Sequence, residues 1–422
     1  MHYSGAIHFL FDLQKFGANL GLENPRRLAM LVDNPQTQLR FIHVAGSNGK
    51  GSTCAMLESI YRAAGLRVGL FTSPHLVSFR ERIQVNRQSI AADDVARIVG
   101  ELKPLLAQFP SNAGPTFFEV VTVLALRYFA EQRCDLVIWE TGLGGRLDAT
   151  NIVTPLASII TNIALEHQQW LGDTLTKIAA EKAGIIKPGV PVITAATEPE
   201  ALGVIEETAV RLDSPITKID STSAGAKIPF TLALLGEHQQ VNAALAVAAV
   251  RVLQAKIPVS DDDIRRGLET VSWPGRLQVV KQLDGRTFLL DGAHNAAGVD
   301  SLRAAMARYF PDVRPALVLG MLADKDWPAM ARALAPLAAR IVAVPVESTR
   351  TVNPVELAAV CRESNRAVEA ADSLNEALRR TQNDRFILVT GSLYLLGEAL
   401  ELLGLLPSDG AERRLNEWKT NK

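Results

Sequence analysis

The sequence predicts an α/β protein made of a large N-terminal domain on a parallel sheet and a smaller C-terminal α/β domain. Short apolar runs alternate with helix-like patterns along nearly the whole chain, which is typical of a mostly parallel sheet covered by helices. The runs are apolar on both faces, as expected of buried parallel strands. The chain has 422 residues, more than one hydrophobic core usually serves, so two or three domains are expected.

Two series of strands are predicted, with helices between the strands of each. The first series lies at 41–45, 68–71, 136–140, 157–161 and 191–194, with helical patterns such as 53–64, 117–132 and 175–183. The second series lies at 287–291, 316–320, 340–344 and 386–390, with helical patterns such as 297–309 and 354–362. The late start of the second series predicts a separate, smaller α/β domain.

The predicted boundary between the domains lies in the segment Ser272-Trp273-Pro274-Gly275-Arg276. Proline and glycine together end the helical region that precedes it. We therefore expect one domain at residues 1–275 and the other at 276–422. The residues from about 408 onward are expected to form a frayed polar tail.

The bulk composition limits the possible partners and location. A formal net charge of −1 gives no field that would recruit nucleic acid or an anionic membrane. No stretch reaches the ~20 apolar residues that a membrane span needs, and the N-terminus lacks the pattern of a signal peptide. Three widely spaced cysteines form no metal or disulfide pattern, so buried thiols in a reducing, cytoplasmic location are expected.

A glycine-rich loop follows the first predicted strand, in the segment Gly46-Ser47-Asn48-Gly49-Lys50-Gly51-Ser52. Glycines let backbone N–H groups approach phosphate oxygens, and the N-terminus of the following helix adds partial positive charge. Lys50 supplies a full charge for the outer phosphates, and Ser52 offers a hydroxyl to magnesium. The loop departs from the full Walker A pattern at Val44 and Gly51. A phosphate loop is predicted; the alternative is a glycine-rich turn.

A carboxylate ends another predicted strand. Glu140 opens the segment Glu140-Thr141-Gly142-Leu143-Gly144-Gly145-Arg146-Leu147-Asp148-Ala149-Thr150-Asn151. A carboxylate at the C-terminal end of a parallel strand points into the ligand crevice, where phosphate-binding enzymes use it to hold magnesium. The glycine pair permits close approach of the backbone to a ligand. The segment therefore predicts a magnesium site at Glu140.

These two segments, with others that follow in the same order, resemble the folylpolyglutamate synthase branch of the Mur ligase superfamily. The resemblance runs from about Phe41 to Leu396. The chain departs from the family pattern at Ser47, where threonine is common, and at Ala296, where proline is usual. The resemblance implies a P-loop domain of the Mur ligase central type, followed by a Rossmann-like C-terminal domain.

The resemblance also implies four groups of site residues. ATP is expected at Asn48, Gly49, Lys50, Gly51, Ser52, Asn242, Arg276 and Asp291. Magnesium is expected at Ser52, Ser73, Glu140 and His167. A pterin or folate is expected at Thr116, Phe117, Phe118, Glu119, Leu147, Asp148 and Ala149. Catalytic roles are expected for Lys50, for a carbamylated Lys182 and for His294, and a weaker glutamate-binding role for Lys325.

Residue chemistry alone leaves simpler roles open at several of these positions. Flat aromatic rings suit a flat heterocycle, but Phe117 and Phe118 also fit an ordinary helix core. Imidazole is an unusual ligand for a hard ion, so His167 also fits a surface or capping position. Lys182 also fits an ion pair at a helix end, and Lys325 fits a solvated turn.

The activity that the resemblance implies is ATP-dependent ligation. L-glutamate would be added to dihydropteroate, to folate polyglutamates or to both, by way of an acyl phosphate. The resemblance further implies a monomer that uses ATP and magnesium. Another Mur-type amino-acid ligase, a P-loop small-molecule kinase and a non-catalytic nucleotide-binding protein are the alternatives.

Overall fold

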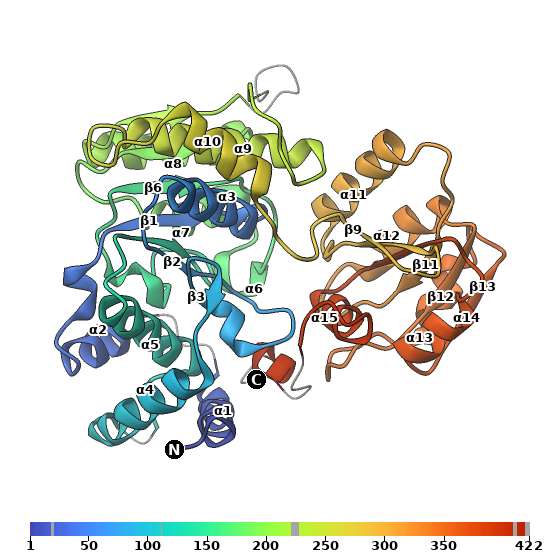
Figure 1. The fold of residues 1–422 in the computed structure, drawn as a ribbon, viewed down its shortest axis with the longest axis horizontal. Helices are drawn as coiled ribbons and strands as arrows, with labels where there is room; N and C mark the ends of the chain where they lie inside the picture. The colour runs from blue at the N-terminus through green and yellow to red at the C-terminus, as the bar shows by residue number, and fades with distance from the viewer. Residues whose placement is uncertain (18–20, 111, 221–227, 408–411, 418–422) are drawn as a thin grey trace.

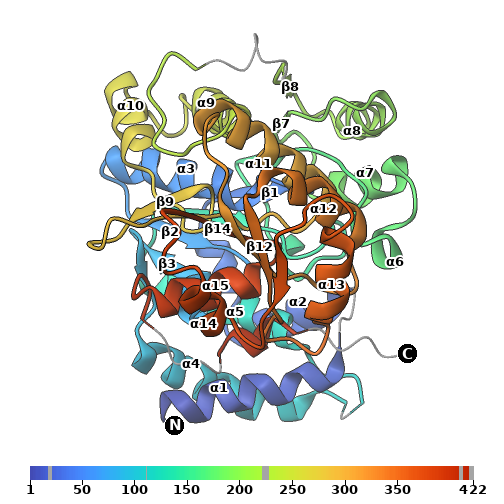
Figure 2. The ribbon, with the colours of Figure 1, turned by 90° about the vertical axis from the view of Figure 1, so that its right-hand side faces the viewer.

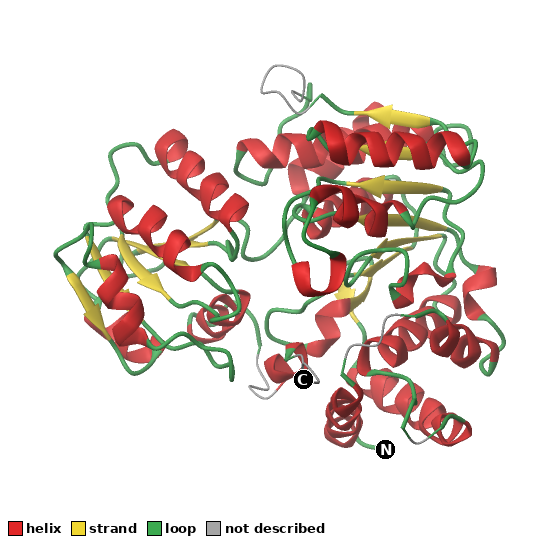
Figure 3. Cartoon of the chain, turned by 180° about the vertical axis from the view of Figure 1, so that it is seen from behind, coloured by secondary structure: helices red, strands yellow, loops and turns green. Residues whose placement is uncertain are grey.

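The computed structural model describes residues 1–17, 21–110, 112–220, 228–407 and 412–417. Within them, two α/β units lie side by side, each built on its own sheet (Figure 1). The view from behind in Figure 3 shows helices packed around the sheet of each unit. The predicted fold class is therefore confirmed.

The N-terminal unit contains an eight-stranded sheet in the order β4-β3-β2-β5-β1-β6-β7-β8. Neighbouring strands are parallel except in the pairs β2–β3 and β3–β4. The strands are β1 (Phe41–Ala45), β2 (Val68–Phe71), β3 (Ile83–Val85), β4 (Gln88–Ser89), β5 (Leu136–Glu140), β6 (Ala157–Ile160), β7 (Val192–Thr194) and β8 (Ile216–Lys218). The helices are α1 (Tyr3–Asp12), α2 (Glu23–Met30), α3 (Lys50–Ala63), α4 (Ala92–Leu105), α5 (Phe117–Glu131), α6 (Gln168–Leu171), α7 (Leu175–Ala183), α8 (Pro199–Arg211), α9 (Glu237–Val252) and α10 (Asp261–Thr270).

Helices cover both faces of this sheet because successive side chains of a strand point to opposite faces. Phe41 and Trp139 pack into the core that α4 and α5 complete. Ile42 and Ile138, their neighbours in sequence, pack into the core that α3, α9 and α10 complete. The central strands are thus buried on both sides, as their unbroken apolar sequences predict.

The C-terminal unit, which faces the viewer in Figure 2, contains a six-stranded sheet in the order β13-β12-β11-β14-β10-β9. Neighbouring strands are parallel except β9–β10. The strands are β9 (Gln278–Lys281), β10 (Thr287–Leu290), β11 (Ala316–Leu319), β12 (Arg340–Ala343), β13 (Val368–Ala370) and β14 (Phe386–Thr390). The helices are α11 (Ala296–Tyr309), α12 (Trp327–Leu334), α13 (Pro354–Cys361), α14 (Leu374–Arg380) and α15 (Leu393–Leu402).

The structure adds detail that the sequence does not predict. Strands β3, β4, β8, β9 and β13 are two to four residues long and carry polar residues, so their sequences resemble loops. Helix α3 begins at Lys50, three residues before the predicted start, which places the lysine in the first helical turn. The connection between the units runs from the end of α10 at Thr270 to the start of β9 at Gln278, and the predicted boundary falls within it.

The expectation of a frayed tail is wrong for residues 412–417. This C-terminal turn contains a short 3-10 helix, η7 (Glu412–Asn416), most of which is buried. In Figure 1 it lies between α1 of the N-terminal unit and α15 of the C-terminal unit. Leu415 packs into the core of the N-terminal unit. Arg413 forms ion pairs with Glu347 and Glu401 of the C-terminal unit. Buried contacts with both units therefore fix a segment whose sequence is polar; residues 408–411 and 418–422 lie outside the described residues.

Two further expectations can be compared with the structure. All three cysteines are buried and free, as predicted. Of the helices in the described parts of the chain, none has the length and apolar character that a membrane crossing requires.

Candidate active site

A cavity of about 1500 Å³ lies between the two units. Its walls include the loops that follow β1, β2, β5 and β6 in the first sheet, and β10, β11 and β14 in the second. Ligands of α/β proteins bind at these C-terminal ends of parallel strands. Pockets for single ligands usually enclose ~300–1,000 Å³, so this cavity has room for more than one substrate.

The glycine-rich loop joins the centre of the first sheet to α3. Gly49 has a φ of 84°, and a side chain there would collide with Oδ1 of Asn242, so glycine is required. The Nζ atom of Lys50 donates to the carbonyls of Gly46 at 2.8 Å and Ser47 at 3.4 Å. The lysine is thus folded over the loop, with its charge beside the helix N-terminus that would receive phosphate groups.

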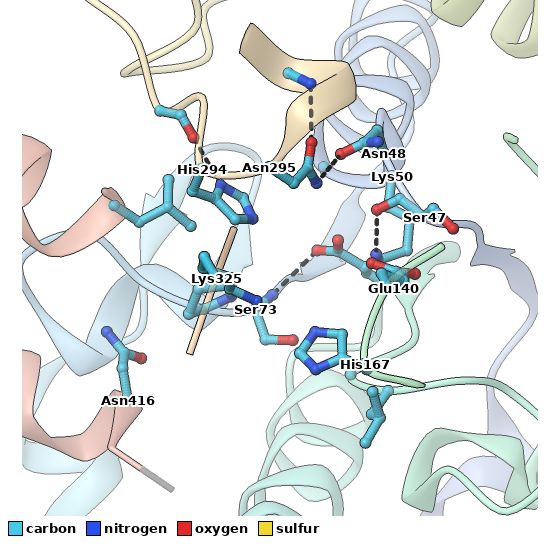
Figure 4. Close-up of a pocket in the computed structure, with 18 of the residues that line it drawn as sticks. Ser47, Asn48, Lys50, Ser73, Glu140, His167, His294, Asn295, Lys325 and Asn416 are labelled. Carbon is cyan, nitrogen blue, oxygen red and sulfur yellow. Dashed lines mark hydrogen bonds between the residues drawn. The ribbon is translucent and has the colours of Figure 1, made fainter. Parts of the chain in front are cut away.

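A second loop and the C-terminal unit hold the glycine-rich loop in place. Asn162 accepts the N–H of Ser47 with its carbonyl at 2.9 Å and the N–H of Asn48 with its side chain at 2.8 Å. The Oγ1 atom of Thr161 donates to the carbonyl of Asn48 at 2.6 Å. Across the cavity, Nδ2 of Asn295 donates to Oδ1 of Asn48 at 2.9 Å (Figure 4). Both units therefore fix this loop.

Three of the four predicted metal residues lie around one space in Figure 4: Ser73, Glu140 and His167. Glu140 ends β5 and is only 4% exposed. Its Oε2 atom accepts the N–H of Ser73 at 3.0 Å. Burial raises the pKa of the Glu140 carboxyl to about 7, although nearby Lys50 acts in the opposite direction.

These side chains fit a divalent cation. A buried carboxyl with a raised pKa is stabilised as an anion when a cation neutralises it. Burial lowers the pKa of His167 to about 4, and the positive charge of Lys325 makes a smaller contribution in the same direction. The imidazole is therefore neutral and able to coordinate a metal ion. The described residues contain no group of three or more His, Cys, Asp or Glu side chains placed to hold a metal, so a cation here would also need the Ser73 hydroxyl and non-protein oxygens.

Ser52, the fourth predicted metal residue, is not brought to this space. It is buried, and its hydroxyl accepts a hydrogen bond from Nε2 of Gln239 on α9 at 3.3 Å. Asn242 donates to Oε1 of the same glutamine at 3.0 Å and, unlike Ser52, lines the cavity. Because Gly51 follows the lysine, the hydroxyl stands one residue later than in a Walker A loop, and one residue rotates a helical side chain by about 100°.

Lys182 lies behind the glycine-rich loop and is 2% exposed. Its Nζ atom donates to the carbonyl of Gly46 at 2.9 Å and to Glu166 at 2.7 Å. Burial lowers the pKa of this lysine to about 8, against the attraction of Glu166. The ion pair considered as the simpler role is therefore present, and the amine can also lose its proton near neutral pH, as carbamylation requires.

The predicted pterin segment forms the start of α5. Thr116 and Glu119 make a capping box: the Glu119 carboxylate accepts the N–H of Thr116 at 2.6 Å, and the Thr116 hydroxyl accepts the N–H of Glu119 at 3.4 Å. The ring of Phe118 packs on Gly142, where a side chain would collide with it. Both phenylalanines of the segment line the cavity and also contact the hydrophobic core.

The adjoining loop residues Leu147, Asp148 and Ala149 also line the cavity. The Asp148 carboxylate accepts the backbone N–H groups of Leu143 at 2.7 Å and Thr150 at 3.0 Å. These hydrogen bonds hold the loop in its conformation. Burial raises the pKa of the Asp148 carboxyl.

The C-terminal unit brings Arg276, Asp291, His294 and Lys325 to the opposite wall. The Asp291 carboxylate accepts the N–H groups of Leu277 at 3.0 Å and Ala293 at 2.9 Å, and so holds the turn that carries its neighbours.

The His294 imidazole is neutral. Its Nδ1 atom lies 2.7 Å from the carbonyl of Gly292, so Nδ1 carries the hydrogen and Nε2 is left as an acceptor. Burial lowers the pKa of His294 to about 4. Arg276 donates to the carbonyl of Gly275 at 3.2 Å and adds a positive charge nearby.

Sequence reasoning missed several polar residues of the cavity: Arg82, Glu166, Asn295, Arg350 and Asn416. Glu166 and Asn295 stand beside predicted residues in loops after strands, so the strand-end rule could have found them. Arg82 and Asn416 belong to short 3-10 helices, and no local pattern marks either one.

Two family models match the chain. The Mur ligase middle domain matches residues 44–198, and the Mur ligase, glutamate ligase domain matches residues 275–393. Together with the paired sheets and the cavity between them, these matches define an ATP-dependent ligase of the Mur type.

Whole-chain comparisons narrow this class. The dihydrofolate synthase/folylpolyglutamate synthase of Bacillus subtilis (strain 168) is 36% identical over 422 residues, 94% of this chain and 98% of that protein. The Mycobacterium tuberculosis folylpolyglutamate synthase complexed with ADP and AMPPCP has a TM-score of 0.86 and 30% identity, over 96% of this chain and 100% of that one. Escherichia coli FolC in complex with DHPP and ADP has a TM-score of 0.83 and 30% identity, over 96% of this chain and 98% of that one. The chain belongs to the dihydrofolate synthase/folylpolyglutamate synthase family.

Proposed function

We propose that this ligase adds L-glutamate to dihydropteroate, to reduced folate polyglutamates or to both, using ATP and magnesium. The observation that carries the proposal is the convergence of Lys50 and Glu140 from one unit with Arg276 from the other on a single cavity. The name of the Bacillus subtilis relative, which joins both activities, supports a bifunctional enzyme. We further propose a monomer whose domains are residues 1–275 and 276–422. The buried free cysteines suit a cytoplasmic location.

In the first step, a carboxylate of the pterin-bearing substrate attacks the γ-phosphate of ATP and ADP leaves. Two anions must approach each other, and the cations Lys50 and Arg276 offset this repulsion from opposite walls of the cavity. Magnesium held by Ser73, Glu140 and His167 would neutralise further phosphate charge. The aromatic rings of Phe117 and Phe118 offer a surface on which a flat pterin can stack.

In the second step, the amine of glutamate attacks the acyl phosphate and phosphate leaves. Lys325 on the C-terminal wall is suited to bind a glutamate carboxylate. The neutral His294, with Nε2 as an acceptor, is suited to orient the amine by a hydrogen bond. Both groups are partly buried between the two units, which limits access of water that would hydrolyse the acyl phosphate.

We also propose that Lys182 becomes carbamylated by carbon dioxide. Its pKa of about 8 leaves a useful fraction of neutral amine at physiological pH, and the modified group would be an anion next to the glycine-rich loop. Carbon-13 NMR of protein supplied with labelled bicarbonate should show a carbamate signal. A spectrum of the wild type identical to that of Lys182→Met would refute the modification.

The test of the function is a direct assay. Purified protein with ATP and magnesium should release phosphate only when glutamate is present together with dihydropteroate or tetrahydrofolate, and comparing these acceptors tests bifunctionality. Lys50→Ala should lower turnover by about 10²–10³-fold because a preorganised charge is lost. Lys177→Ala, in an exposed ion pair with Asp173, is the matched control. Phosphate transfer to a hydroxyl without amide formation would favour a kinase instead.

A further inference from the structure

A buried arginine in the cavity wall has only uncharged hydrogen-bond partners. Arg82 ends the 3-10 helix η3 (Phe79–Arg82), is 4% exposed and lines the cavity. Its Nε atom donates to Nδ1 of His75 at 2.8 Å, and its Nη2 atom donates to Oδ1 of Asn416 at 2.6 Å. Among the described residues, no carboxylate forms an ion pair with it.

His75 does not neutralise this charge or compete with it. Because Arg82 donates to Nδ1, the ring hydrogen is on Nε2, which donates to the carbonyl of Glu412 at 2.9 Å. Burial holds the pKa of His75 well below its usual range. The imidazole is therefore a neutral support for the guanidinium.

The C-terminal turn supplies the rest of this support. Glu412 accepts the N–H of Phe79 at 2.7 Å, at the start of the 3-10 helix that carries Arg82. Asn416, labelled in Figure 4, also donates through Nδ2 to the carbonyl of His75 at 2.9 Å. Residues far apart in sequence thus fix both the backbone and the side chain of the arginine.

The nearby carboxyl groups of Glu81 and Glu140 attract this cation, but neither forms an ion pair or hydrogen bond with it. A buried cation without a direct anionic partner is costly, and a bound carboxylate would relieve that cost. The guanidinium of Arg82 lies 5.4 Å from the ring centroid of Phe117, in the part of the cavity suited to a pterin. We propose that Asn416 is a positioning residue that presents Arg82, still positively charged, to a carboxylate of the pterin-bearing substrate. The inference rests on the proposed function.

The amide at position 416 is central to this role. It accepts a hydrogen bond from Arg82 without supplying negative charge. An aspartate of nearly the same shape would keep the hydrogen bond from Arg82 but form an ion pair with it, so the cation would already be occupied. This ion pair also offsets the loss of the hydrogen bond that Nδ2 of Asn416 donates to the carbonyl of His75. Asn416→Asp therefore separates the electrostatic role from a purely structural one.

The experiment measures binding of dihydropteroate and, separately, of ATP to the full chain by calorimetry. In Asn416→Asp, dihydropteroate should bind about tenfold more weakly, because its carboxylate must displace a charged competitor. The affinity for ATP and the midpoint of thermal unfolding should stay close to those of the wild type. In turnover assays, KM for dihydropteroate should rise while kcat changes little. Arg414→Ala, exposed on the same turn, is the control and should leave both affinities unchanged.

Unchanged dihydropteroate affinity in Asn416→Asp would overturn the inference. Parallel losses of both affinities and of thermal stability would overturn it too, since they indicate a structural role only. A wild type that binds ATP but no pterin would refute the proposed function itself, and this inference with it.

Discussion

At the scale of the residue, burial sets the charge of the groups around the cavity. His43 in the central strand β1 is an example outside the ligand-binding surface: it is fully buried, and its Nε2 atom lies 3.0 Å from Oγ1 of Thr150. Its Nδ1 atom is buried and has no hydrogen-bond partner among the residues that the structure describes. Protonation would place an unpaired charge there, so burial, with a smaller effect from Lys187, lowers its pKa to about 3.

We predict that His43 makes the protein sensitive to acid. The unfolded chain binds a proton near the ordinary pKa of 6.5, whereas the folded chain does so near 3, so stability is lost as pH falls through this window. Lowering the pH from 7.5 to 5 should reduce the free energy of unfolding by about 2 kcal/mol through His43 alone. Urea unfolding should show that His43→Gln loses less stability over this range than the wild type.

The matched control is His8→Gln, an exposed position on α1. If both variants kept the wild-type dependence of unfolding free energy on pH, the account of His43 would be wrong.

The residues that sequence could and could not predict differ in how local their signals are. Lys50 and Glu140 stand directly after buried strands, so a strand pattern and a few neighbours suffice to find them. Arg82 and Asn416 meet through a contact between residues 334 positions apart. Neither position has a local sequence feature that predicts this contact, because it depends on how the C-terminal turn folds back.

At the scale of the element, close packing between helices explains a glycine outside any turn. Gly267 in α10 lies against α3, where an added Cβ atom would come within 2.7 Å of the backbone nitrogen of Ile60 and 2.5 Å of its Cα. Backbone atoms cannot move aside as a flexible side chain can. The glycine therefore sets how closely these two helices approach behind the glycine-rich loop.

We predict opposite effects for two glycine substitutions within helices. Gly267→Ala should destabilise the protein by about 1–3 kcal/mol because the helices must separate. Gly203→Ala in α8, where the added Cβ atom meets no described residue within 4 Å, should stabilise it by roughly 0.5–1 kcal/mol through helix propensity. Urea unfolding should show a lower free energy of unfolding for Gly267→Ala and a higher one for Gly203→Ala. Equal changes in the two variants would contradict the packing argument.

Element-scale prediction from sequence succeeds where elements are long and buried. Helix α7 and strands β1, β2 and β5 match their predicted bounds, because unbroken apolar runs and helical spacing identify them. The edge strands β4 and β8 are short and partly exposed, so they carry no such pattern. Pairing with a neighbouring strand, which is a non-local interaction, defines them.

At the scale of the whole molecule, a few polar contacts join the two units across the cavity. Asn295 makes one of them, because its Nδ2 atom donates to Oδ1 of Asn48 at 2.9 Å. Within its own unit, its Oδ1 atom caps α11 by accepting the N–H of Gly298 at 2.8 Å. The start of a helix in one unit is thus tied to the glycine-rich loop of the other.

We predict that Asn295→Asp uncouples the units while preserving the helix. The aspartate can still cap α11. Its second oxygen, however, would face the Oδ1 atom of Asn48 in place of a donor, so ATP affinity should fall about tenfold. Calorimetry measures this change, and Asn353→Asp, which alters the exposed cap of α13, is the control. Equal ATP affinity in both variants would contradict this prediction.

The C-terminal turn described above also bears on how these molecules could be recombined. Leu415 fills a place in the core of the N-terminal unit, and Glu412 and Asn416 bind its backbone. A chimaera made by exchanging everything beyond residue 275 with a relative would therefore also replace part of the first unit. Exchange of domains between family members should succeed only if the turn and the residues that it contacts in the N-terminal unit come from the same parent.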